Sequence, residues 1–414
     1  RLRRLNEDAE IIVFEKGPYV SFANCGLPYY VSGEIKEREG LIVQSATALK
    51  KRFNIDVREK SEVVKIDSET KTVTVLSEGE EYIESYDKLI LSPGARPFLP
   101  DIIGLNDSEN IFTLRNIPDV DRIVEFIKMN NPKRATIIGA GFIGLEMAEN
   151  LANRGLQVTI VEKAPHVLPP IDAEMAAFVN EELTKNSVKV LTNAEAVKFS
   201  GNEILLDSGE VIVSDLTILS VGIKPETSLA KLAGIKLGFR DGIVVDEQYE
   251  TSIKDIYAVG DAIVVKNQIG QDSLISLASP ANRQGRQVAD IISGLSSKNK
   301  GSQGTAIVRV FNLQAASTGL SERQVQLSNL TYKAIHITAN DHAGYYPGAS
   351  AITLKLIFNP DNGEIYGAQA VGQKGIDKRI DILSTAIKAG LTIFDLPELE
   401  FTYAPPFGSA KDPV

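Results

Sequence analysis

The chain contains a single cysteine, Cys25, and its surroundings favour a reactive thiol. Residues 26–28 are Gly-Leu-Pro, and residues 29–32 are expected to form a short helix that Gly33 ends. Proline fits a first helical turn because that position needs no N–H donor. The thiol would then lie at a helix start, where the helix dipole stabilises a thiolate. A lone cysteine can instead be a small buried apolar residue. The helix start favours a nucleophile that attacks sulfur–sulfur bonds.

A glycine-rich segment in the middle of the chain predicts a dinucleotide site. Residues 135–138 are typical of a strand, and Gly139-Ala140-Gly141-Phe142-Ile143-Gly144 follows directly. A helix is expected over 145–154 and a second strand over 158–161, which Glu162 ends. A bare G-x-G-x-x-G also occurs in ordinary turns, but this order of strand, glycines, helix, strand and acid is typical of a dinucleotide-binding unit.

Each glycine of this segment has a physical role. Gly139 permits the tight turn, Gly141 lets the backbone approach a pyrophosphate, and Gly144 lets the helix pack closely on the strand. Free N–H groups at the helix start favour the pyrophosphate. Glu162 can accept hydrogen bonds from both ribose hydroxyls and would repel a 2′-phosphate, so NADH is favoured. Lys163 beside it leaves NADPH possible.

Part of a second nucleotide unit stands at the amino-terminal end. Residues 1–5 are typical of a helix end, and residues 10–15 form an apolar strand that the acid Glu15 closes. The first strand and glycine loop of such a unit are therefore expected before Arg1, in roughly 20 further residues. Two half-sites indicate two dinucleotides. The nesting of the second unit inside the first predicts a split FAD domain around an NAD domain.

The remaining segments complete a three-domain prediction. Strands that end in turn glycines or acids are expected in 86–95, 216–222 and 256–261. From about Gly304 the pattern changes to strands over 350–358 and 365–371 and an amphipathic helix over 376–389. We predict an α/β protein with two Rossmann-like nucleotide-binding domains and an α+β domain. The FAD domain is expected over 1–112 and 241–303, the NAD domain over 113–240, and the α+β domain over 304–414.

Composition excludes several classes of function. The net charge of −10 argues against nucleic-acid binding, which requires concentrated Lys and Arg. The single cysteine and three scattered histidines, at 166, 336 and 342, predict no metal site. No apolar run approaches the roughly 20 residues of a membrane span. The chain does not open with a signal peptide, so a cytoplasmic location is expected.

Four segments closely resemble one family over the whole chain. They are residues 21–30 (SFANCGLPYY), 114–116 (LRN), 257–261 (YAVGD) and 403–412 (YAPPFGSAKD). The chain resembles the coenzyme A disulfide reductases, in the single-cysteine branch of the pyridine nucleotide–disulfide oxidoreductases. That branch also contains coenzyme A persulfide or polysulfide reductases, NADH oxidases and NADH peroxidases. The resemblance implies that the α+β domain is a dimerisation domain and that the protein is a homodimer.

The resemblance also implies roles for individual residues. Glu15 would bind the FAD ribose and Asp261 the ribitol chain, and Cys25 would be the redox thiol beside the isoalloxazine. Tyr345 and Tyr403 would reach the active site of the partner subunit, with Tyr346 as an alternative to Tyr345. The implied FAD contacts are Glu15, Lys16, Ser92, Gly94, Arg115, Asp261, Pro280 and Ala281. The implied NAD contacts are Gly139, Gly141, Phe142, Ile143, Gly144, Glu162 and Gly222. The implied coenzyme A contacts are Arg4, Ser21, Phe22, Asn24 and Arg52.

These roles imply a reaction in which NADH reduces FAD and the electrons then pass to a disulfide or persulfide on Cys25. Two alternatives stay open: an NADH oxidase in which dioxygen oxidises Cys25 to a sulfenic acid, and a non-enzymatic flavoprotein redox sensor. The tyrosines could instead be interface packing residues. The basic residues in 1–4 and 50–52 could be solvated helix faces rather than a site for coenzyme A phosphates.

Overall fold

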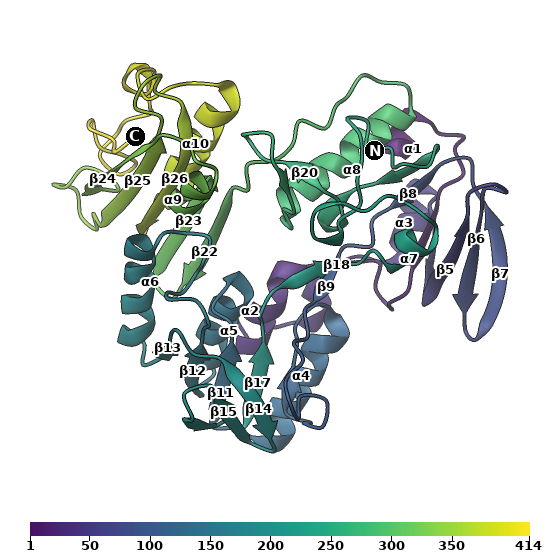
Figure 1. Cartoon of the computed structure of the whole chain (residues 1–414), viewed down its shortest axis with the longest axis horizontal. Helices are drawn as coiled ribbons and strands as arrows, with labels where there is room; N and C mark the ends of the chain where they lie inside the picture. Colours follow the sequence, from purple (N-terminus) through teal and green to yellow (C-terminus); the bar gives the residue numbers. More distant parts are fainter.

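The computed structural model describes residues 1–414 as three packed parts (Figure 1). In the amino-terminal part, α1 (Leu2–Leu5) precedes β1 (Ile12–Glu15), which pairs in parallel with β4 (Asp56–Glu59). A second parallel pair joins β8 (Leu89–Leu91) to β19 (Ile256–Ala258). Neither β1 nor β8 has a second strand partner. The strand and glycine loop expected before Arg1 lie outside the described residues.

An antiparallel sheet extends this part, and it was not expected from the sequence. It consists of β5 (Ser61–Asp67), β6 (Thr72–Ser77) and β7 (Glu80–Ser85). In β6, Val73 and Val75 are buried and alternate with more exposed threonines, as a sheet with one covered face requires. Both valines belong to a core shared with the residues of β19. The helix α8 (Ala278–Ile292) contributes Val288 to the same core.

The middle part contains a parallel five-stranded sheet in the order β10-β17-β11-β12-β13. Its centre is the predicted unit: β11 (Arg134–Ile138), α5 (Phe142–Asn153) and β12 (Gln157–Val161). The predicted order of strand, glycines, helix and strand is therefore confirmed. The other elements of the sheet are β10 (Ile111–Phe112), β13 (Lys189–Leu191) and β17 (Leu216–Leu219), and the small sheet beside it is β14 (Ala196–Ser200), β15 (Glu203–Leu206) and β16 (Val211–Val213).

Two chain crossings join the first two parts side by side. β9 (Ala95–Pro97) pairs antiparallel with β18 (Ile223–Pro225). The next helix, α7 (Ser228–Leu232), buries Ala230 in the core of the amino-terminal part. This packing favours a return to that part near Gly222 rather than near residue 240. β10 is an edge strand of the NAD-type sheet, which favours an entry before residue 113.

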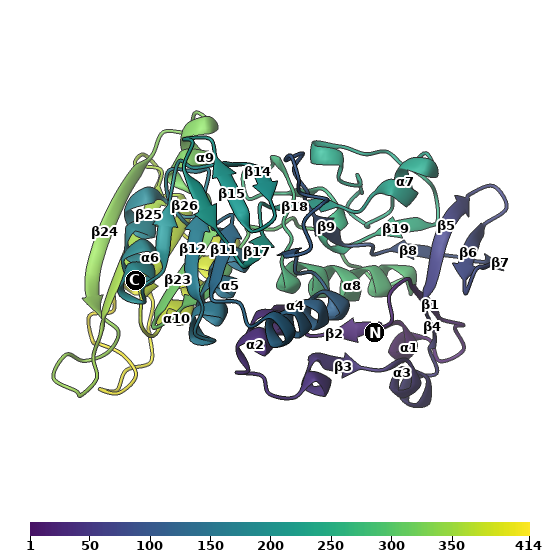
Figure 2. The same ribbon diagram turned by 90° about the horizontal axis from the view of Figure 1, so that it is seen from below.

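The carboxy-terminal part is an antiparallel five-stranded sheet with a helix on each face (Figure 2). Neighbouring residues of a strand point to opposite faces. In β26 (Ile365–Gly372), Ala370 belongs to the core with α10 (Ile376–Ala389), whereas Val371 belongs to the core with α6 (Ala173–Lys185) of the middle part. The predicted strands over 350–358 and 365–371 and the helix over 376–389 are confirmed. The remaining strands of the sheet are β22 (Ala306–Val310), β23 (Leu313–Gly319), β24 (Lys333–Asn340) and β25 (Ala351–Phe358).

The remaining strands and helices complete these parts. They are β2 (Ser21–Phe22), α2 (Leu27–Ser32), β3 (Ile42–Gln44), α3 (Ala46–Phe53), α4 (Ile117–Asn130), β20 (Val265–Lys266), β21 (Asp272–Ser273) and α9 (Glu322–Leu327). None of the helices combines the length and the apolar character that crossing a membrane would require. The parallel nucleotide-type sheet and the antiparallel carboxy-terminal sheet agree with the predicted α/β class.

Candidate active site

A cavity of about 950 Å³ lies where the three parts meet. Cys25 opens into it, together with Arg115, which stands before α4, and Asp261, which stands after β19. Gly141 and Phe142 at the start of α5 line the same cavity. Of the residues singled out from the sequence, the cavity contains Asn24, Cys25, Arg115, Gly141, Phe142, Ile143, Gly222, Asp261 and Pro280. Residues far apart in the chain and assigned to both dinucleotides therefore converge on the single thiol.

Cys25 lies in a short 3-10 turn over residues 24–26, immediately before α2. The predicted helix is confirmed, although it begins at Leu27, and Gly33 ends it in the left-handed conformation. Leu27 and Val31 are fully buried in the main core and fix the helix in place. The side chain of Cys25 itself is exposed. The alternative of a thiol buried among apolar residues is therefore wrong.

Three features of the structure oppose the expected stabilisation of the thiolate. Partial burial raises the pKa of the Cys25 thiol, and the carboxylates of Glu146 and Asp261 raise it further. The helix that follows contains only six residues, so its dipole is small against two nearby negative charges. The groups of this chain therefore favour the protonated thiol.

The residues around Arg115 have the features of a cofactor cradle. The Asn24 side-chain amide, oriented to satisfy both partners, donates to the Arg115 carbonyl oxygen over 3.1 Å and accepts from Arg115 Nη1 over 2.6 Å. Gly94 has φ +72°, and a Cβ there would lie 2.7 Å from Arg115 Nη2. The carboxylate of Asp261 is half-buried and forms no hydrogen bond within the chain. A half-buried acceptor without a donor fits the ribitol hydroxyls that Asp261 is expected to bind.

The glycine loop has the geometry that its sequence predicts. Gly139 has φ +100°, and a Cβ there would lie 2.5 Å from the Ser220 carbonyl oxygen. A Cβ at Gly144 would collide with the Gly139 carbonyl oxygen, so the close approach of α5 requires glycine. Gly141 begins α5 as its N-cap and has open space around its Cβ position. The loop therefore leaves room for a ligand at Gly141 and nowhere else among the three.

Glu162 follows β12 and is buried, and its carboxylate binds the backbone of the glycine loop. Its Oε2 accepts from Ala140 N over 2.6 Å, and its Oε1 accepts from Ala164 N over 2.7 Å. Each carboxylate oxygen can accept a further hydrogen bond, so ribose binding remains available. Lys163 forms an ion pair with Glu195 over 2.7 Å. Its charge is therefore already engaged, which favours NADH over a nucleotide with a 2′-phosphate.

Replacing Gly141 by alanine is expected to weaken NADH binding without weakening the fold. The added methyl group meets no protein atom within 4 Å, but it occupies the space through which a pyrophosphate reaches the loop. We expect the KM for NADH to rise about tenfold or more, equivalent to about 1.4 kcal/mol, with an unchanged urea unfolding midpoint. Gly144→Ala is the matched control, because its clash with backbone should lower the midpoint. An unchanged KM in Gly141→Ala would refute this role.

Other residues that the resemblance implied lie outside the cavity lining. Glu15 ends β1, and its Oε1 accepts from Gly17 N over 2.6 Å, the same local geometry as Glu162 with Ala164. Phe22 packs against the main core. The FAD-assigned residues outside the lining are Glu15, Lys16, Ser92, Gly94 and Ala281, and the NAD-assigned ones are Gly139, Gly144 and Glu162.

The basic residues at the amino-terminal end separate into two groups. Arg1 pairs with Asp290 over 2.7 Å, and Arg3 donates to the carbonyl oxygens of Phe53 and Asn54. Arg4 and Arg52 are exposed and form no ion pair within the chain, although Arg52 stacks on Phe53. The two arginines assigned to coenzyme A phosphates are therefore free to bind an anion.

Tyr345 and Tyr403 lie together, and neither lines the cavity that contains Cys25. Their hydroxyl oxygens are 3.0 Å apart, and the side chains are 76% and 53% exposed. The hydrogen bond to Tyr403 raises the pKa of Tyr345. Tyr346 instead packs edge-on to His342, which is buried and bonds to Asp341. The structure thus pairs Tyr345, rather than Tyr346, with Tyr403, on a surface outside the Cys25 cavity of the same subunit.

Sequence reasoning missed Glu146. This residue follows Gly144 by two positions on α5 and lines the cavity with Cys25. Burial raises the pKa of Glu146 to about 7. The available signal was an acid in the otherwise apolar segment from Phe142 to Met147.

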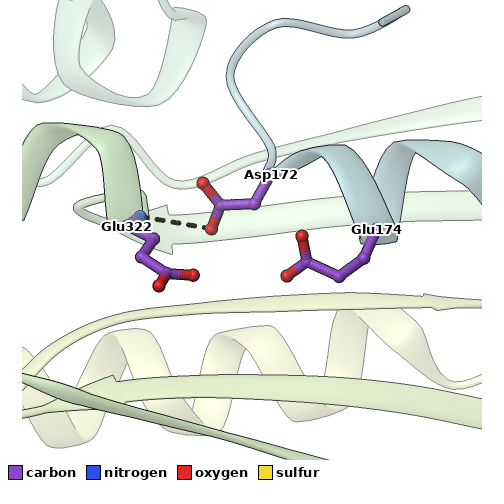
Figure 3. A group of neighbouring side chains, drawn as sticks. All are labelled: Asp172, Glu174 and Glu322. Carbon is purple, nitrogen blue, oxygen red and sulfur yellow. Dashed lines mark hydrogen bonds between the residues drawn. The ribbon is translucent and has the colours of Figure 1, made fainter.

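A second missed cluster joins the middle and carboxy-terminal parts. The carboxylates of Asp172, Glu174 and Glu322 converge, as a metal site would require (Figure 3). Their centre is filled by the ammonium group of Lys355, which lies 2.9 Å from Asp172 and 2.7 Å from Glu322 and also contacts Glu174. Lys355 is fully buried. A lysine thus offsets part of the negative charge of the cluster and joins α6 to the carboxy-terminal sheet.

Comparisons with known proteins agree with this architecture. Residues 1–285 match the model of the family described as pyridine nucleotide-disulphide oxidoreductase, and residues 305–412 match its dimerisation domain. The coenzyme A disulfide reductase of Staphylococcus aureus strain JH9 is 38% identical over all of this chain and 94% of its own length. The structure of reduced Bacillus anthracis CoADR-RHD is 52% identical, with a TM-score of 0.99, over all of this chain and 75% of that one. The NAD-dependent persulfide reductase of A. fulgidus is 38% identical, with a TM-score of 0.97, over all of this chain and 78% of that one.

Proposed function

The chain belongs to the pyridine nucleotide-disulphide oxidoreductase family, and on that premise we propose that it uses NADH and FAD to reduce coenzyme A disulfide or coenzyme A persulfide through Cys25. The observation that carries this proposal is the shared cavity. The exposed thiol, the open glycine loop at Gly141 and the unpartnered carboxylate of Asp261 all line it. A thiol that adjoins two nucleotide sites is suited to transferring electrons between a nucleotide and sulfur.

The residues of the chain suit the binding of both nucleotides. Asp261 would hold the ribitol of FAD, Glu15 its ribose, and Gly94 and Arg115 its edge. Lys16, Ser92, Pro280 and Ala281 complete this set. Gly141 and Glu162 would contact NADH, and Gly139 and Gly144 would shape the loop that holds it. Phe142, Ile143 and Gly222 would lie around its reactive end. When bound, FAD supplies the two-electron relay between NADH and sulfur.

The part played by Cys25 follows from its chemistry. Its thiolate attacks one sulfur of coenzyme A disulfide, so that a mixed disulfide forms and one coenzyme A thiolate leaves. Two electrons from NADH then cleave the mixed disulfide, which returns the Cys25 thiolate and releases the second coenzyme A. The balance is one disulfide, one NADH and one proton converted to two thiols and NAD⁺. With one cysteine, the second sulfur must come from the substrate.

Coenzyme A would lie along the surface between Cys25 and the amino-terminal arginines. Ser21, Phe22 and Asn24 stand beside the thiol in sequence. The free charges of Arg4 and Arg52 support phosphate binding by a protein whose net charge is −10. Arg1 and Arg3 are already bonded and are not assigned to the ligand.

We assign Tyr345 and Tyr403 to the active site of a partner subunit in a homodimer. They would donate the proton that a departing coenzyme A thiolate takes up, since a neutral phenol can stabilise a developing thiolate. Their exposure, their mutual hydrogen bond and their absence from the lining of the Cys25 cavity support this assignment.

A hybrid dimer is expected to reveal the shared site. One protomer carries Cys25→Ser and the other carries Tyr345→Phe with Tyr403→Phe, and two affinity tags isolate the mixed species. If the tyrosines act across the interface, one of the two sites keeps both its thiol and its phenols. We then expect about half of the wild-type turnover, since one complete site of two remains. A hybrid as inactive as the two parent variants would place the tyrosines in their own subunit.

The acceptor is tested by steady-state comparison. The purified flavoprotein oxidises NADH in separate assays with coenzyme A disulfide, coenzyme A persulfide and air-saturated buffer. We expect kcat/KM for a coenzyme A sulfur acceptor to exceed that for dioxygen. A larger value for dioxygen would indicate the oxidase instead, with Cys25 passing through a sulfenic acid.

A further inference from the structure

Three carboxylates and one guanidinium meet beside the cavity, at the junction of α2, α5 and β22. Arg309 binds Glu34 through both terminal nitrogens, over 3.1 and 2.7 Å, and binds Glu149 over 2.9 Å. Glu149 also accepts from Phe311 N over 3.0 Å. The single cation is therefore committed to two of the three acids.

Glu146 is the acid left without a cation. Its one hydrogen bond comes from the Tyr29 hydroxyl, which lies 3.5 Å from Oε1. The Tyr29 ring lies 5.1 Å from the Arg309 guanidinium carbon, so the same arginine orients it. Glu146 lines the cavity that Cys25 opens into, whereas Glu34 and Glu149 do not. The acid that forms no ion pair thus lines the same cavity as the thiol, although Arg309 still lowers its pKa through the longer-range charge interaction. The titratable and charged groups that act on Glu146 are Tyr29, Glu149 and Arg309, and Glu146 acts in turn on Cys25 together with Asp261.

We propose that Glu146 is a positioning residue that controls when the Cys25 thiol ionises: while it is a carboxylate it suppresses thiolate formation, and when it binds a proton it releases that suppression. The proposal rests on the proposed function only in taking Cys25 as the redox thiol. It would make nucleophilic attack by Cys25 depend on the protonation of a residue on the helix that begins at the NAD loop.

The charges on the two groups agree with this coupling. Burial raises the pKa of Glu146 to about 7, and the hydrogen bond from Tyr29 opposes that shift. The pKa of Cys25 is raised by burial first and by Glu146 second. A nearby negative charge disfavours a second one, so each group ionises less readily when the other is charged. Below about pH 7 the proton on Glu146 removes this repulsion from the thiol.

The test is the pH dependence of alkylation at Cys25, which as the only cysteine reports alone. Flavin-loaded protein is reduced, desalted to remove bound thiols, and treated with iodoacetamide from about pH 5 to 9, and intact mass gives the rate. In the wild type, the logarithm of the rate should rise with pH, flatten near pH 7 as Glu146 ionises, and then rise again. Glu146→Gln should show no such flattening.

The ratio of the alkylation rate in Glu146→Gln to that in the wild type separates an electrostatic effect from a structural one. Glu146→Gln should react like the wild type below about pH 6 and faster above pH 8. A thiol pKa lower by about one unit gives about ten times more thiolate, each about threefold less nucleophilic, for a net gain of roughly threefold. A purely structural effect would change the rate by the same factor at every pH. Such a constant ratio would overturn the proposal.

A second variant tests the same proposal even if the substitution Glu146→Gln disturbs the local structure. Tyr29→Phe removes the hydroxyl that lowers the pKa of Glu146 and keeps the ring beside Arg309, so the flattening should move to higher pH. Glu125→Gln, an exposed acid on α4, is the charge-matched control and should reproduce the wild-type profile. An unmoved profile in Tyr29→Phe would contradict the proposal. Alkylation requires no turnover, so a failure of the proposed function would leave these outcomes unchanged.

Discussion

Cys25→Ser is expected to lose reduction of coenzyme A disulfide by roughly 10³-fold or more, because loss of a nucleophile removes the covalent step altogether. Reduction of the flavin by NADH should continue, since the loop at Gly139–Gly144 and the residues assigned to FAD are untouched. Stopped-flow absorbance of the flavin measures the first half-reaction, and NADH consumption with coenzyme A disulfide measures turnover.

The two half-reactions separate the competing explanations. A variant that folds, binds flavin, is reduced by NADH and does not turn over has lost only the sulfur chemistry. Flavin content and the unfolding midpoint serve as controls for folding. Turnover that persists in Cys25→Ser would contradict the mechanism. If the wild type shows no turnover and Cys25→Ser keeps the biological role of the protein, a redox sensor is favoured.

Lys355→Met is expected to cost about 3 kcal/mol of unfolding free energy. The substitution keeps the buried volume but leaves three carboxylates without their cation, and breaking a buried ion pair from one side costs about 3–5 kcal/mol. The lower value applies because Glu174 and Glu322 are 49% and 31% exposed and remain partly hydrated. Urea unfolding at neutral pH measures the loss.

The pH dependence and a double variant test the cause of that loss. Clustered carboxylates without a cation have raised pKa values in the folded state, so the folded form binds protons more readily than the unfolded form. The deficit of Lys355→Met should therefore shrink as the pH falls from about 7 to 5. Adding Glu322→Gln should also recover stability by removing one repelling charge. If the loss of stability stays the same at lower pH and after Glu322→Gln is added, its cause is lost packing rather than lost charge.

Local sequence signals predicted the elements that depend on local chemistry. The unit from β11 to β12 follows from glycines at fixed spacing and an acid at the strand end, and α2 follows from Pro28 and Gly33. The α10 helix follows from its apolar period and Gly390. Each of these signals lies within a few residues of the structure that it specifies.

Features that depend on distant contacts were not predicted. The antiparallel sheet over residues 61–85 is stabilised by packing of Val73 and Val75 against residues near 256–263. Lys355 meets its partners only after the chain folds, because they come from α6 and α9. The raised pKa of the Cys25 thiol was missed for the same reason. The helix start was visible in the sequence, but the carboxylates of Glu146 and Asp261, which oppose ionisation, come from α5 and from the turn after β19.

Intact mass spectrometry of the flavin-loaded protein after exposure to coenzyme A disulfide tests the central claim most directly. The account predicts one coenzyme A joined to Cys25 as a mixed disulfide, its loss on addition of NADH, and its absence in Cys25→Ser. An unmodified thiol, or an adduct on Cys25 that NADH fails to remove, would contradict the claim that this sulfur exchanges electrons with the nucleotide sites around it.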